Sequence, residues 1–277
     1  MAGFPAGSVS DVQIGGHPAK AFVLTNAIDT TTAACRSRSC SPSPSTTSRY
    51  GSRVETILAL IPGYQEGPRI ASVAERTRAF LPVVVVDDGS TDDTAARAEA
   101  AGATVLIQRP NAGKGAALRR GFRYALDQGC EAVVTLDADG QHDPAEIPSF
   151  LAAYASSRPE LIIGRRDFGE MPPVRRLSNS LGGWVFSAAV GRNVPDNQSG
   201  YRLIGRQLMT ALLDSEEHGF EFEVEMIARC IALGLPIDWV PIRTIYEGEP
   251  SHIRPWPHFT SFLRVTRDAN RIVRGKR

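Results

Sequence analysis

Short apolar runs alternate with longer amphipathic stretches through the middle of the chain. The runs are largely β-branched and bounded by turn residues, and they predict buried strands at 57–61, 83–86, 104–107 and 132–136. The stretches between them predict helices at 70–81, 91–101 and 115–128. This β-α-β-α-β-α-β order predicts an α/β fold, in which helices cover both faces of a mostly parallel central sheet.

The rest of the chain has a weaker pattern. It predicts helices at 145–155, 179–190 and 222–233, and strands at 161–163 and 237–242. From Phe259 to Val273, apolar residues recur at helical spacing, and basic residues occupy much of the remainder. A basic amphipathic helix of this kind can rest on an anionic membrane surface, or it can pack on the domain and leave a solvated basic end. We therefore set 251–277 apart as a basic amphipathic tail.

Residues 1–53 differ from those that follow. The segment lacks apolar periodicity and is rich in Ser, Thr, Pro and Arg between Thr30 and Ser45. Such a composition cannot bury enough apolar surface to offset the entropy of ordering. It predicts a disordered extension or a start site assigned too early, with a targeting peptide as a further alternative. Residues 54–250 then form one large domain.

Composition narrows the class of protein. The net charge is +1, which argues against a general nucleic-acid binder. Cys35, Cys40, Cys130 and Cys230 form no CxxC pair and no zinc spacing, so we expect free thiols in a reducing compartment. The softest stretch, 181–191, falls well short of the roughly 20 apolar residues that a membrane span needs. These features favour a cytoplasmic protein, either free or peripheral on the cytoplasmic face of a membrane.

Two aspartates follow the fourth predicted strand. Asp137 and Asp139 stand at the end of a buried run, where two carboxylates repel each other and resist burial. A divalent cation resolves both problems, and Mg²⁺ is typically held by one or two carboxylates together with substrate phosphates. Gln141 offers an amide oxygen two residues further on. The pattern favours a metal site that carries a phosphorylated ligand over an ordinary turn.

The end of the second predicted strand is also acidic, at the edge where open α/β sheets bind ligands. Asp87 and Asp88 can accept hydrogen bonds from a base or from ribose hydroxyls. The alternative is a helix N-cap, which Ser90, Thr91 or Asp92 can supply alone. That leaves the two aspartates without a structural task and favours contact with a ligand.

Three further polar segments are ambiguous by themselves. Asn111–Gly115 places Lys114 in a glycine-rich turn that opens a helix, where it can hold a phosphate or form a simple cap. This segment matches neither a Walker A loop nor GxGxxG. The loop 196–202 and the pair Arg165–Arg166 can each bind a ligand or lie at the surface.

Taken together, these segments resemble the family 2 glycosyltransferases of GT-A type. The resemblance rests on 61–66, 86–90, 111–115 and 137–139, and it covers roughly 54–163. A shorter match, at 196–202 and 248–252, resembles the branch that makes polyprenyl-phosphate sugars, which includes dolichyl-phosphate mannosyltransferase and dolichyl-phosphate glucosyltransferase. The resemblance implies a GT-A, Rossmann-like fold for 54–250.

The resemblance also implies roles for individual residues. Those expected to bind the nucleotide sugar are Pro62, Tyr64, Glu66, Asp88, Lys114, Asp137 and Arg166. Asp137, Asp139 and Gln141 are expected to hold Mg²⁺ or Mn²⁺ on the diphosphate. Arg166 and Arg202 are expected to face the donor and acceptor phosphates. Two departures are Gln65 in place of Asn, and Pro250 with His252 where the family often has Gly-Glu-Ser-Lys.

The implied reaction is an inverting, metal-dependent transfer of a hexose from a nucleotide sugar, GDP-mannose or UDP-glucose, to a polyprenyl phosphate. A hydroxyl acceptor would need a general base, for which Asp196 is the candidate. A phosphate acceptor needs positive charge instead, which favours Arg202. The alternatives are a family 2 enzyme that acts on a hydroxyl of a soluble glycan or polysaccharide, a nucleotidyltransferase, and an inactive nucleotide-sugar binder.

Overall fold

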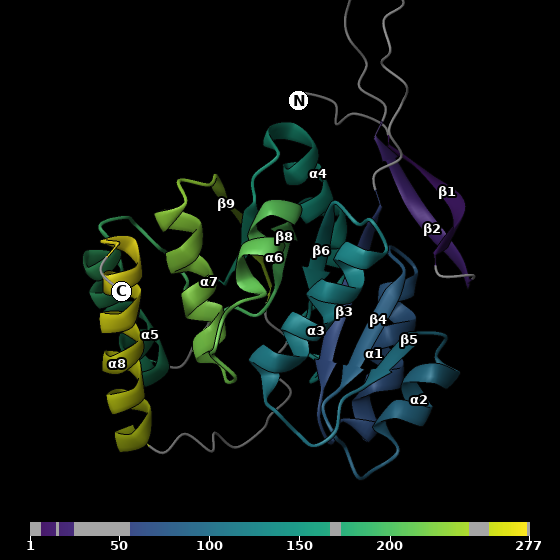
Figure 1. The fold of residues 1–277 in the computed structure, drawn as a ribbon, viewed down its shortest axis with the longest axis horizontal. Helices are drawn as coiled ribbons and strands as arrows, with labels where there is room; N and C mark the ends of the chain where they lie inside the picture. Colours follow the sequence, from purple (N-terminus) through teal and green to yellow (C-terminus); the bar gives the residue numbers. More distant parts are fainter. Residues whose placement is uncertain (1–6, 15–16, 25–55, 167–172, 244–254, 276–277) are drawn as a thin grey trace, which may run out of the picture.

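The computed structural model describes residues 7–14, 17–24, 56–166, 173–243 and 255–275 (Figure 1). Its central sheet has seven strands in the spatial order β5-β4-β3-β6-β8-β7-β9. These strands are β3 (Ile57–Gly63), β4 (Val83–Asp87), β5 (Thr104–Ile107), β6 (Ala132–Thr135), β7 (Leu161–Arg166), β8 (Arg202–Gly205) and β9 (Ile237–Ile242).

Strand direction follows the prediction with one exception. β3 pairs in parallel with β4 and β6, β4 pairs in parallel with β5, and β7 pairs in parallel with β9. β8 runs antiparallel to both of its neighbours, β6 and β7. The predicted mostly parallel α/β sheet is therefore confirmed. β8 is absent from the prediction because its short apolar run directly follows the polar loop 196–202.

Helices cover both faces of the sheet, as predicted (Figure 1). One face shares a hydrophobic cluster with α1 (Gly67–Arg78), α2 (Thr94–Ala100) and α4 (Ile147–Ser157), which follows the 3₁₀ turn η1 (Pro144–Glu146). The other face shares a cluster with α3 (Lys114–Asp127), α5 (Pro173–Val190), α6 (Arg206–Leu212), α7 (Glu221–Ala232) and α8 (Pro255–Val273).

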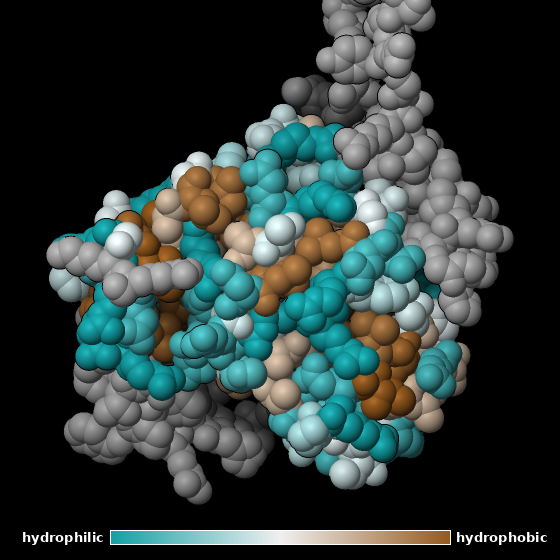
Figure 2. Space-filling model, viewed as in Figure 1, coloured by the Kyte–Doolittle hydropathy of each residue, from teal (hydrophilic) through white to brown (hydrophobic). Residues whose placement is uncertain are grey.

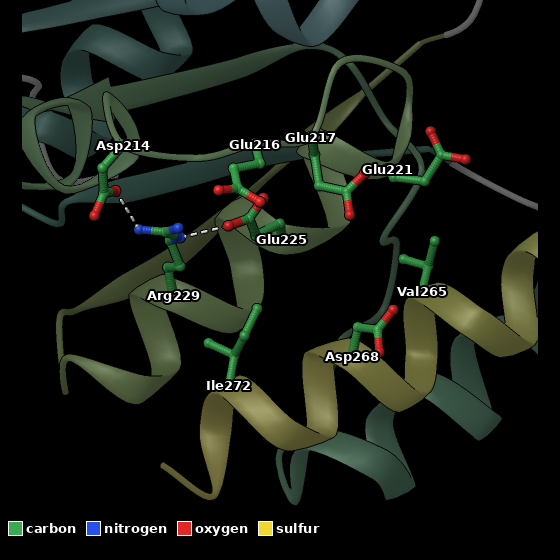
Figure 3. A pocket seen from close by; sticks show the side chains of 9 residues that line it. All are labelled: Asp214, Glu216, Glu217, Glu221, Glu225, Arg229, Val265, Asp268 and Ile272. Carbon is green, nitrogen blue, oxygen red and sulfur yellow. Dashed lines mark hydrogen bonds and ion pairs between the residues drawn. The ribbon is translucent and has the colours of Figure 1, made fainter. Parts of the chain in front are cut away.

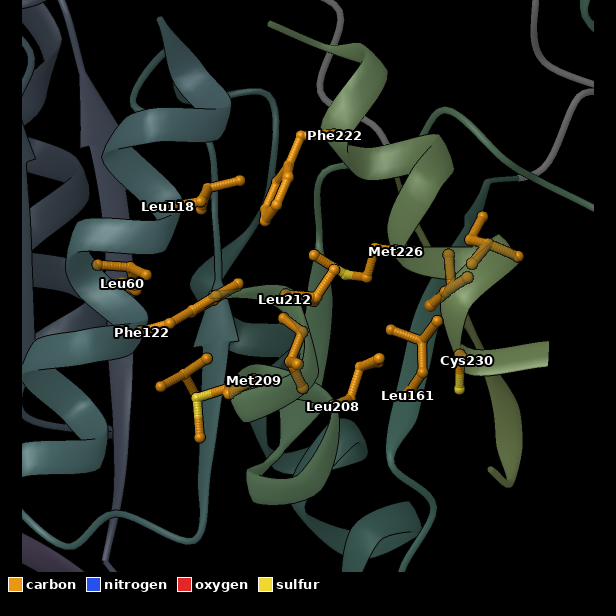
Figure 4. Close-up of a cluster of buried hydrophobic side chains, with 14 of the residues drawn as sticks. Leu60, Leu118, Phe122, Leu161, Leu208, Met209, Leu212, Phe222, Met226 and Cys230 are labelled. Atoms are coloured by element: carbon orange, nitrogen blue, oxygen red, sulfur yellow. The ribbon is translucent and has the colours of Figure 1, made fainter. Parts of the chain in front are cut away.

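Side-chain alternation along β3 divides the core into these two clusters. Leu58 and Leu60 join the cluster beneath α3, α6 and α7, part of which is shown in Figure 4, whereas Ala59 and Ile61 join the cluster beneath α1 and α4. Full burial of each leucine contributes about 1.5–3 kcal/mol. A Cβ at Gly121 would clash with the Leu60 side chain, so glycine allows α3 to approach β3 closely.

A hairpin lies outside the main sheet. β1 (Gly7–Ile14) and β2 (His17–Leu24) pair in antiparallel fashion, whereas the sequence predicts no regular structure in 1–53. The Gly-Gly dipeptide at 15–16 is a local hairpin signal between two short runs of mixed polarity. The remainder of that segment, and the motif at 248–252, lie outside the described residues.

The described part of the C-terminal helix packs on the protein. Ala269 is buried, and Asn270 Nδ2 donates to the main-chain oxygen of Ala189 in α5 at 2.5 Å. The side chains of Arg267 and Arg271 are 65% and 57% exposed. This part of the tail is therefore a packed helix with a solvated basic side.

The surface of the described residues is largely hydrophilic on the face drawn in Figure 2, where hydrophobic residues form separate groups. Among the described helices, none combines the length and the apolar character needed to cross a membrane.

Candidate active site

A cavity of about 420 Å³ opens at the carboxyl ends of β3, β4 and β6. Parallel pairing of β3 with β4 and β6 brings these strand ends to one edge of the sheet, where ligands bind in open α/β folds. The predicted site residues that line the cavity are Pro62, Tyr64, Glu66, Asp88, Lys114, Asp137 and Asp139. The fold therefore brings together most of the residues that the sequence singles out.

Asp88 is buried and anchors the glycine-rich turn. Its Oδ1 accepts from Gln108 Nε2 at 2.6 Å and from the Ala112 main-chain nitrogen at 2.9 Å. Its Oδ2 accepts from the Gly113 main-chain nitrogen at 2.7 Å. Asp87 Oδ1 accepts from the main-chain nitrogen three residues further along, at 3.2 Å. The expectation that neither aspartate has a structural task is therefore wrong, although Asp88 does line the cavity.

The turn between β3 and α1 carries the next group of predicted residues. Gln65 has a left-handed backbone, with φ at 58°, and its main-chain nitrogen donates to Ser90 Oγ at 2.9 Å. The Glu66 main-chain nitrogen donates to Thr94 Oγ1 at 2.9 Å. These bonds fix the turn and leave Tyr64 half exposed, at 50%, on the cavity wall.

Lys114 lies between two carboxylates at the start of α3. Its Nζ is 2.5 Å from Asp137 Oδ1 and 3.1 Å from Glu223 Oε1. Burial alone would lower the pKa of Lys114, but these two carboxylates raise the pKa well above its usual range, so the ammonium stays charged. Burial likewise opposes ionisation of Asp137, yet Lys114 holds the pKa of Asp137 below its usual value.

The side chains after β6 suit a hard divalent cation. Burial and the neighbouring Asp137 carboxylate raise the pKa of Asp139, as expected for two like charges held close together. Asp139 Oδ1 accepts from the Gln141 main-chain nitrogen at 2.9 Å, and the Gln141 side chain is exposed in the same turn. Over the described ranges, no group of three His, Cys, Asp or Glu residues could hold a metal by itself. These oxygen donors therefore fit Mg²⁺ or Mn²⁺ shared with the phosphates of a ligand.

His142 supports the turn that carries Asp137 and Asp139. Its Nδ1 accepts from the Asp137 main-chain nitrogen at 3.2 Å, and its ring packs on Tyr201 with centroids 5.1 Å apart. Burial lowers the pKa of His142, which favours the neutral ring that such an acceptor requires. The ring thereby fixes the main chain that carries Asp137.

Arg166 and Asp196 form a bidentate ion pair away from the cavity. Arg166 Nε and Nη2 donate to Asp196 Oδ2 and Oδ1 at 2.7 and 2.9 Å. The Asp196 side chain is 1% exposed and also accepts from the Gln198 main-chain nitrogen at 3.1 Å. Both oxygens of the predicted base are therefore already engaged.

Arg202 lies beneath the site. It is 1% exposed, and its guanidinium donates to the main-chain oxygens of Ser199 at 2.7 Å, Asn197 at 3.2 Å and Glu223 at 2.5 Å. This placement differs from the predicted contact with an acceptor phosphate, because main-chain oxygens occupy all three guanidinium nitrogens. Arg202 instead ties the loop 196–202 to the start of α7.

Two side chains at the site are absent from the sequence-based prediction, Phe220 and Glu223. Phe220 lines the cavity and is 72% exposed, and Lys114 Nζ lies 5.3 Å from its ring centroid. The His218 main-chain oxygen accepts from the Gly115 main-chain nitrogen at 2.7 Å, which docks this segment on α3. Glu223 lies in the first turn of α7, 3.1 Å from Lys114 Nζ. An acid at such a position is explained equally well by the helix dipole, so the sequence alone does not indicate that Glu223 contacts Lys114.

A second cavity, of about 370 Å³, lies between α7, α8 and the loop before α7 (Figure 3). It is lined by Asp214, Glu216, Glu217, Glu221, Glu225, Arg229, Val265, Asp268 and Ile272. Figure 3 shows Arg229 between Asp214 and Glu225. Its guanidinium lies 2.6 Å from the nearest oxygen of each acid. The predicted site residues all lie elsewhere, so this acidic cavity is separate from the strand-end cavity.

Parallel strand ends, a lysine at a helix N-terminus and an Asp-x-Asp pair on one cavity define the site of a GT-A glycosyltransferase. The chain belongs to the Glycosyl transferase family 2, whose model matches residues 60–212. The predicted fold class and the predicted glycosyltransferase activity are thereby confirmed.

Within this family, the chain is similar to relatives from the polyprenyl-phosphate branch, as predicted. An undecaprenyl-phosphate mannosyltransferase from Micrococcus luteus is 34% identical over 208 residues, which cover 70% of this chain and 84% of the relative. A polyprenol monophosphomannose synthase from Mycolicibacterium smegmatis is 32% identical over 210 residues, which cover 69% of this chain and 78% of the relative.

A solved structure with the same fold is the glucosyl-3-phosphoglycerate synthase of Mycobacterium tuberculosis. Its complex with Mn²⁺, UDP-glucose and phosphoglyceric acid has a TM-score of 0.62 at 22% identity, over 80% of each chain. A further structure of that enzyme contains Mg²⁺ and UDP. At this identity the likeness concerns the fold, and the bound groups are those of that enzyme.

Proposed function

We propose that this glycosyltransferase moves a hexose from GDP-mannose or UDP-glucose to a polyprenyl phosphate, with inversion at the anomeric carbon. The names of the two relatives, an undecaprenyl-phosphate mannosyltransferase and a polyprenol monophosphomannose synthase, support this class of acceptor. The cavity at the strand ends supports a nucleotide sugar as donor, because it combines a lysine with a pair of aspartates.

The observation that carries the acceptor assignment is the pairing of Asp196. A hydroxyl acceptor needs a general base, but both Asp196 oxygens are bound by Arg166 and the side chain is 1% exposed. A phosphate monoester is largely ionised at pH 7, with a second pKa of about 6, and needs no such base. The arrangement therefore favours a phosphate acceptor.

In this proposal, different residues contact different parts of the bound donor. Pro62, Tyr64, Glu66 and Asp88 border the nucleoside, and Lys114 at the α3 N-terminus faces the diphosphate. Mg²⁺ or Mn²⁺ held by Asp137, Asp139 and Gln141 would stabilise the negative charge that develops on the leaving diphosphate. Arg166 and Arg202 both hold the loop 196–202 that shapes the acceptor side, Arg166 through its ion pair with Asp196 and Arg202 through main-chain oxygens.

A polyprenyl acceptor implies a membrane surface next to the enzyme. Trp184 on α5 is 69% exposed, and tryptophan favours membrane interfaces. The helix α8, which packs on α5, exposes Arg264, Arg267 and Arg271, with side-chain exposures of 56%, 65% and 57%, and these arginines also pair with Glu221 or Asp268. We infer that the α5–α8 side rests on anionic lipid through these groups, while the apolar side of α8 stays inside the protein.

The test is transfer of labelled sugar into extractable lipid. The full-length protein is incubated with Mn²⁺, radiolabelled GDP-mannose or UDP-glucose, and vesicles that contain undecaprenyl phosphate. We expect label in the lipid extract, and none when undecaprenol with a free hydroxyl replaces the phosphate. Asp139→Asn is the inactive control. Label found only in water-soluble products, or found equally with undecaprenol, would refute the phosphate acceptor.

A further inference from the structure

Glu223 and Asp137 approach each other closely because residue 200 is glycine. A Cβ on Gly200 would lie 2.6 Å from Asp137 Oδ2 and 3.0 Å from Glu223 Oε1. Any larger residue would therefore push apart the two carboxylates that share Lys114. Gly200 belongs to the loop 196–202, so this loop sets how closely Asp137 and Glu223 approach each other around Lys114.

Glu223 is held firmly behind the cavity. Its main-chain oxygen accepts from the buried Arg202 at 2.5 Å, and its side chain is only 7% exposed. Lys114 and Asp137 line the cavity, whereas Glu223 does not. Glu223 therefore contacts the ammonium from outside the cavity lining.

A divalent ion held by Asp137 would compete with Lys114 for that carboxylate. The Lys114 ammonium lies 2.5 Å from Asp137 Oδ1, and a cation bound through the same carboxylate would repel it. An ammonium that loses its partner in a buried position is strongly destabilised. Glu223, at 3.1 Å, is the partner that remains.

We propose that Glu223 is a positioning residue for Lys114. It would retain the ammonium while Asp137 holds a divalent ion, and it would keep the ammonium at the cavity wall, where the diphosphate of the donor would bind. Glu223 itself touches no reacting atom. The inference rests on the proposed function, which supplies both the metal and the diphosphate.

Glu221 provides a matched control for Glu223. Both acids lie in the first turn of α7, where either can interact favourably with the helix dipole. The Glu221 side chain, however, pairs with Arg264 at 3.3 Å and faces the acidic cavity. Glu221→Gln therefore makes the same change of charge in the same turn without touching Lys114.

The experiment measures binding of GDP and UDP to the full-length protein in Mn²⁺ by isothermal titration calorimetry. We expect Glu223→Gln to bind the nucleoside diphosphate about 10-fold more weakly, as for other residues that orient groups at metal sites. Loss of a negative charge near an anionic ligand would by Coulomb's law strengthen binding, so weakening points to Lys114. Glu221→Gln is expected to bind like the wild type.

A double-mutant cycle tests whether Glu223 acts through Lys114. In a Lys114→Met background, Glu223→Gln should cause no further loss of affinity. Glu223→Asp keeps the charge with a shorter reach and should fall between wild type and Glu223→Gln, which serves if the latter folds poorly. Unchanged or tighter binding by Glu223→Gln, or additive losses in the cycle, would overturn the inference. If the wild type binds neither GDP nor UDP, the proposed function fails as well.

Discussion

Replacing Asp88 with asparagine is expected to loosen the turn that leads into α3. The carboxylate accepts three hydrogen bonds, from Gln108, Ala112 and Gly113, at 2.6, 2.9 and 2.7 Å. Asparagine keeps one oxygen and replaces the other with an amide nitrogen, which donates. In either orientation of the amide, at least one N–H of the turn then faces another donor.

The cost can be worked from these contacts. Asp88 is 3% exposed, and a buried N–H without an acceptor costs about 1–3 kcal/mol. The bonds that remain also weaken, because hydrogen bonds to charged groups contribute about 1.5–3 kcal/mol against about 1 kcal/mol for neutral ones. We therefore expect a loss of about 2–4 kcal/mol in the free energy of unfolding. For a domain of this size, that corresponds to a fall in Tm of roughly 4–16 °C.

Thermal and urea denaturation followed by circular dichroism measure this loss. Asp87→Asn is the matched control, because Asp87 accepts a single longer bond at 3.2 Å and should cost less than about 1 kcal/mol. A variant Asp88→Asn that unfolds at the wild-type Tm but no longer binds nucleoside diphosphate would refute the reasoning, since Asp88 would then act as a ligand contact alone.

Three further outcomes are expected. Asp139→Asn should lower the affinity for Mn²⁺ by more than about 10-fold in calorimetric titration, and chelation with EDTA should abolish sugar transfer by the wild type. Asp196→Asn should lower the Tm because it breaks a buried ion pair, yet kcat with undecaprenyl phosphate should fall less than about 10-fold, whereas a general base would cost about 10²–10⁴-fold. Burial raises the pKa of the Cys130 and Cys230 thiols to about 12, so at pH 8 a thiol reagent should label their peptides only after denaturation, as read by mass spectrometry.

Apolar periodicity predicted much of the sheet and many of its helices. β9 has the predicted bounds, and α3 and α7 differ by one residue at each end from the predicted 115–128 and 222–233. These elements bury a continuous strand or one clear helical face, so their local pattern is strong. The grouping of polar residues at the strand ends can also be predicted from the sequence, because parallel pairing alone brings the carboxyl ends of the strands together.

Contacts between distant segments could not be predicted in this way. Lys114 pairs with Glu223, and Arg166 pairs with Asp196, across long stretches of chain that carry no periodic link. The residue type of Arg202 suits a phosphate, but its environment of main-chain oxygens depends on how α7 packs against the loop 196–202. A charged side chain is able to bind a ligand of opposite charge, but tertiary packing decides whether that side chain lies where a ligand binds.

The antiparallel strand β8 explains how the second half of the site reaches the same edge of the sheet. Arg202 at the start of β8 pairs with Thr135 at the end of β6, and Thr135 Oγ1 donates to the Gly200 main-chain oxygen at 2.8 Å. Because β8 runs opposite to β6, the loop before β8 lies beside the turn after β6, which carries Asp137. A parallel β8 would place that loop at the opposite ends of the strands, next to the start of β6. The one reversal of direction is therefore what sets Gly200 against Asp137 and the Arg202 guanidinium beneath Glu223.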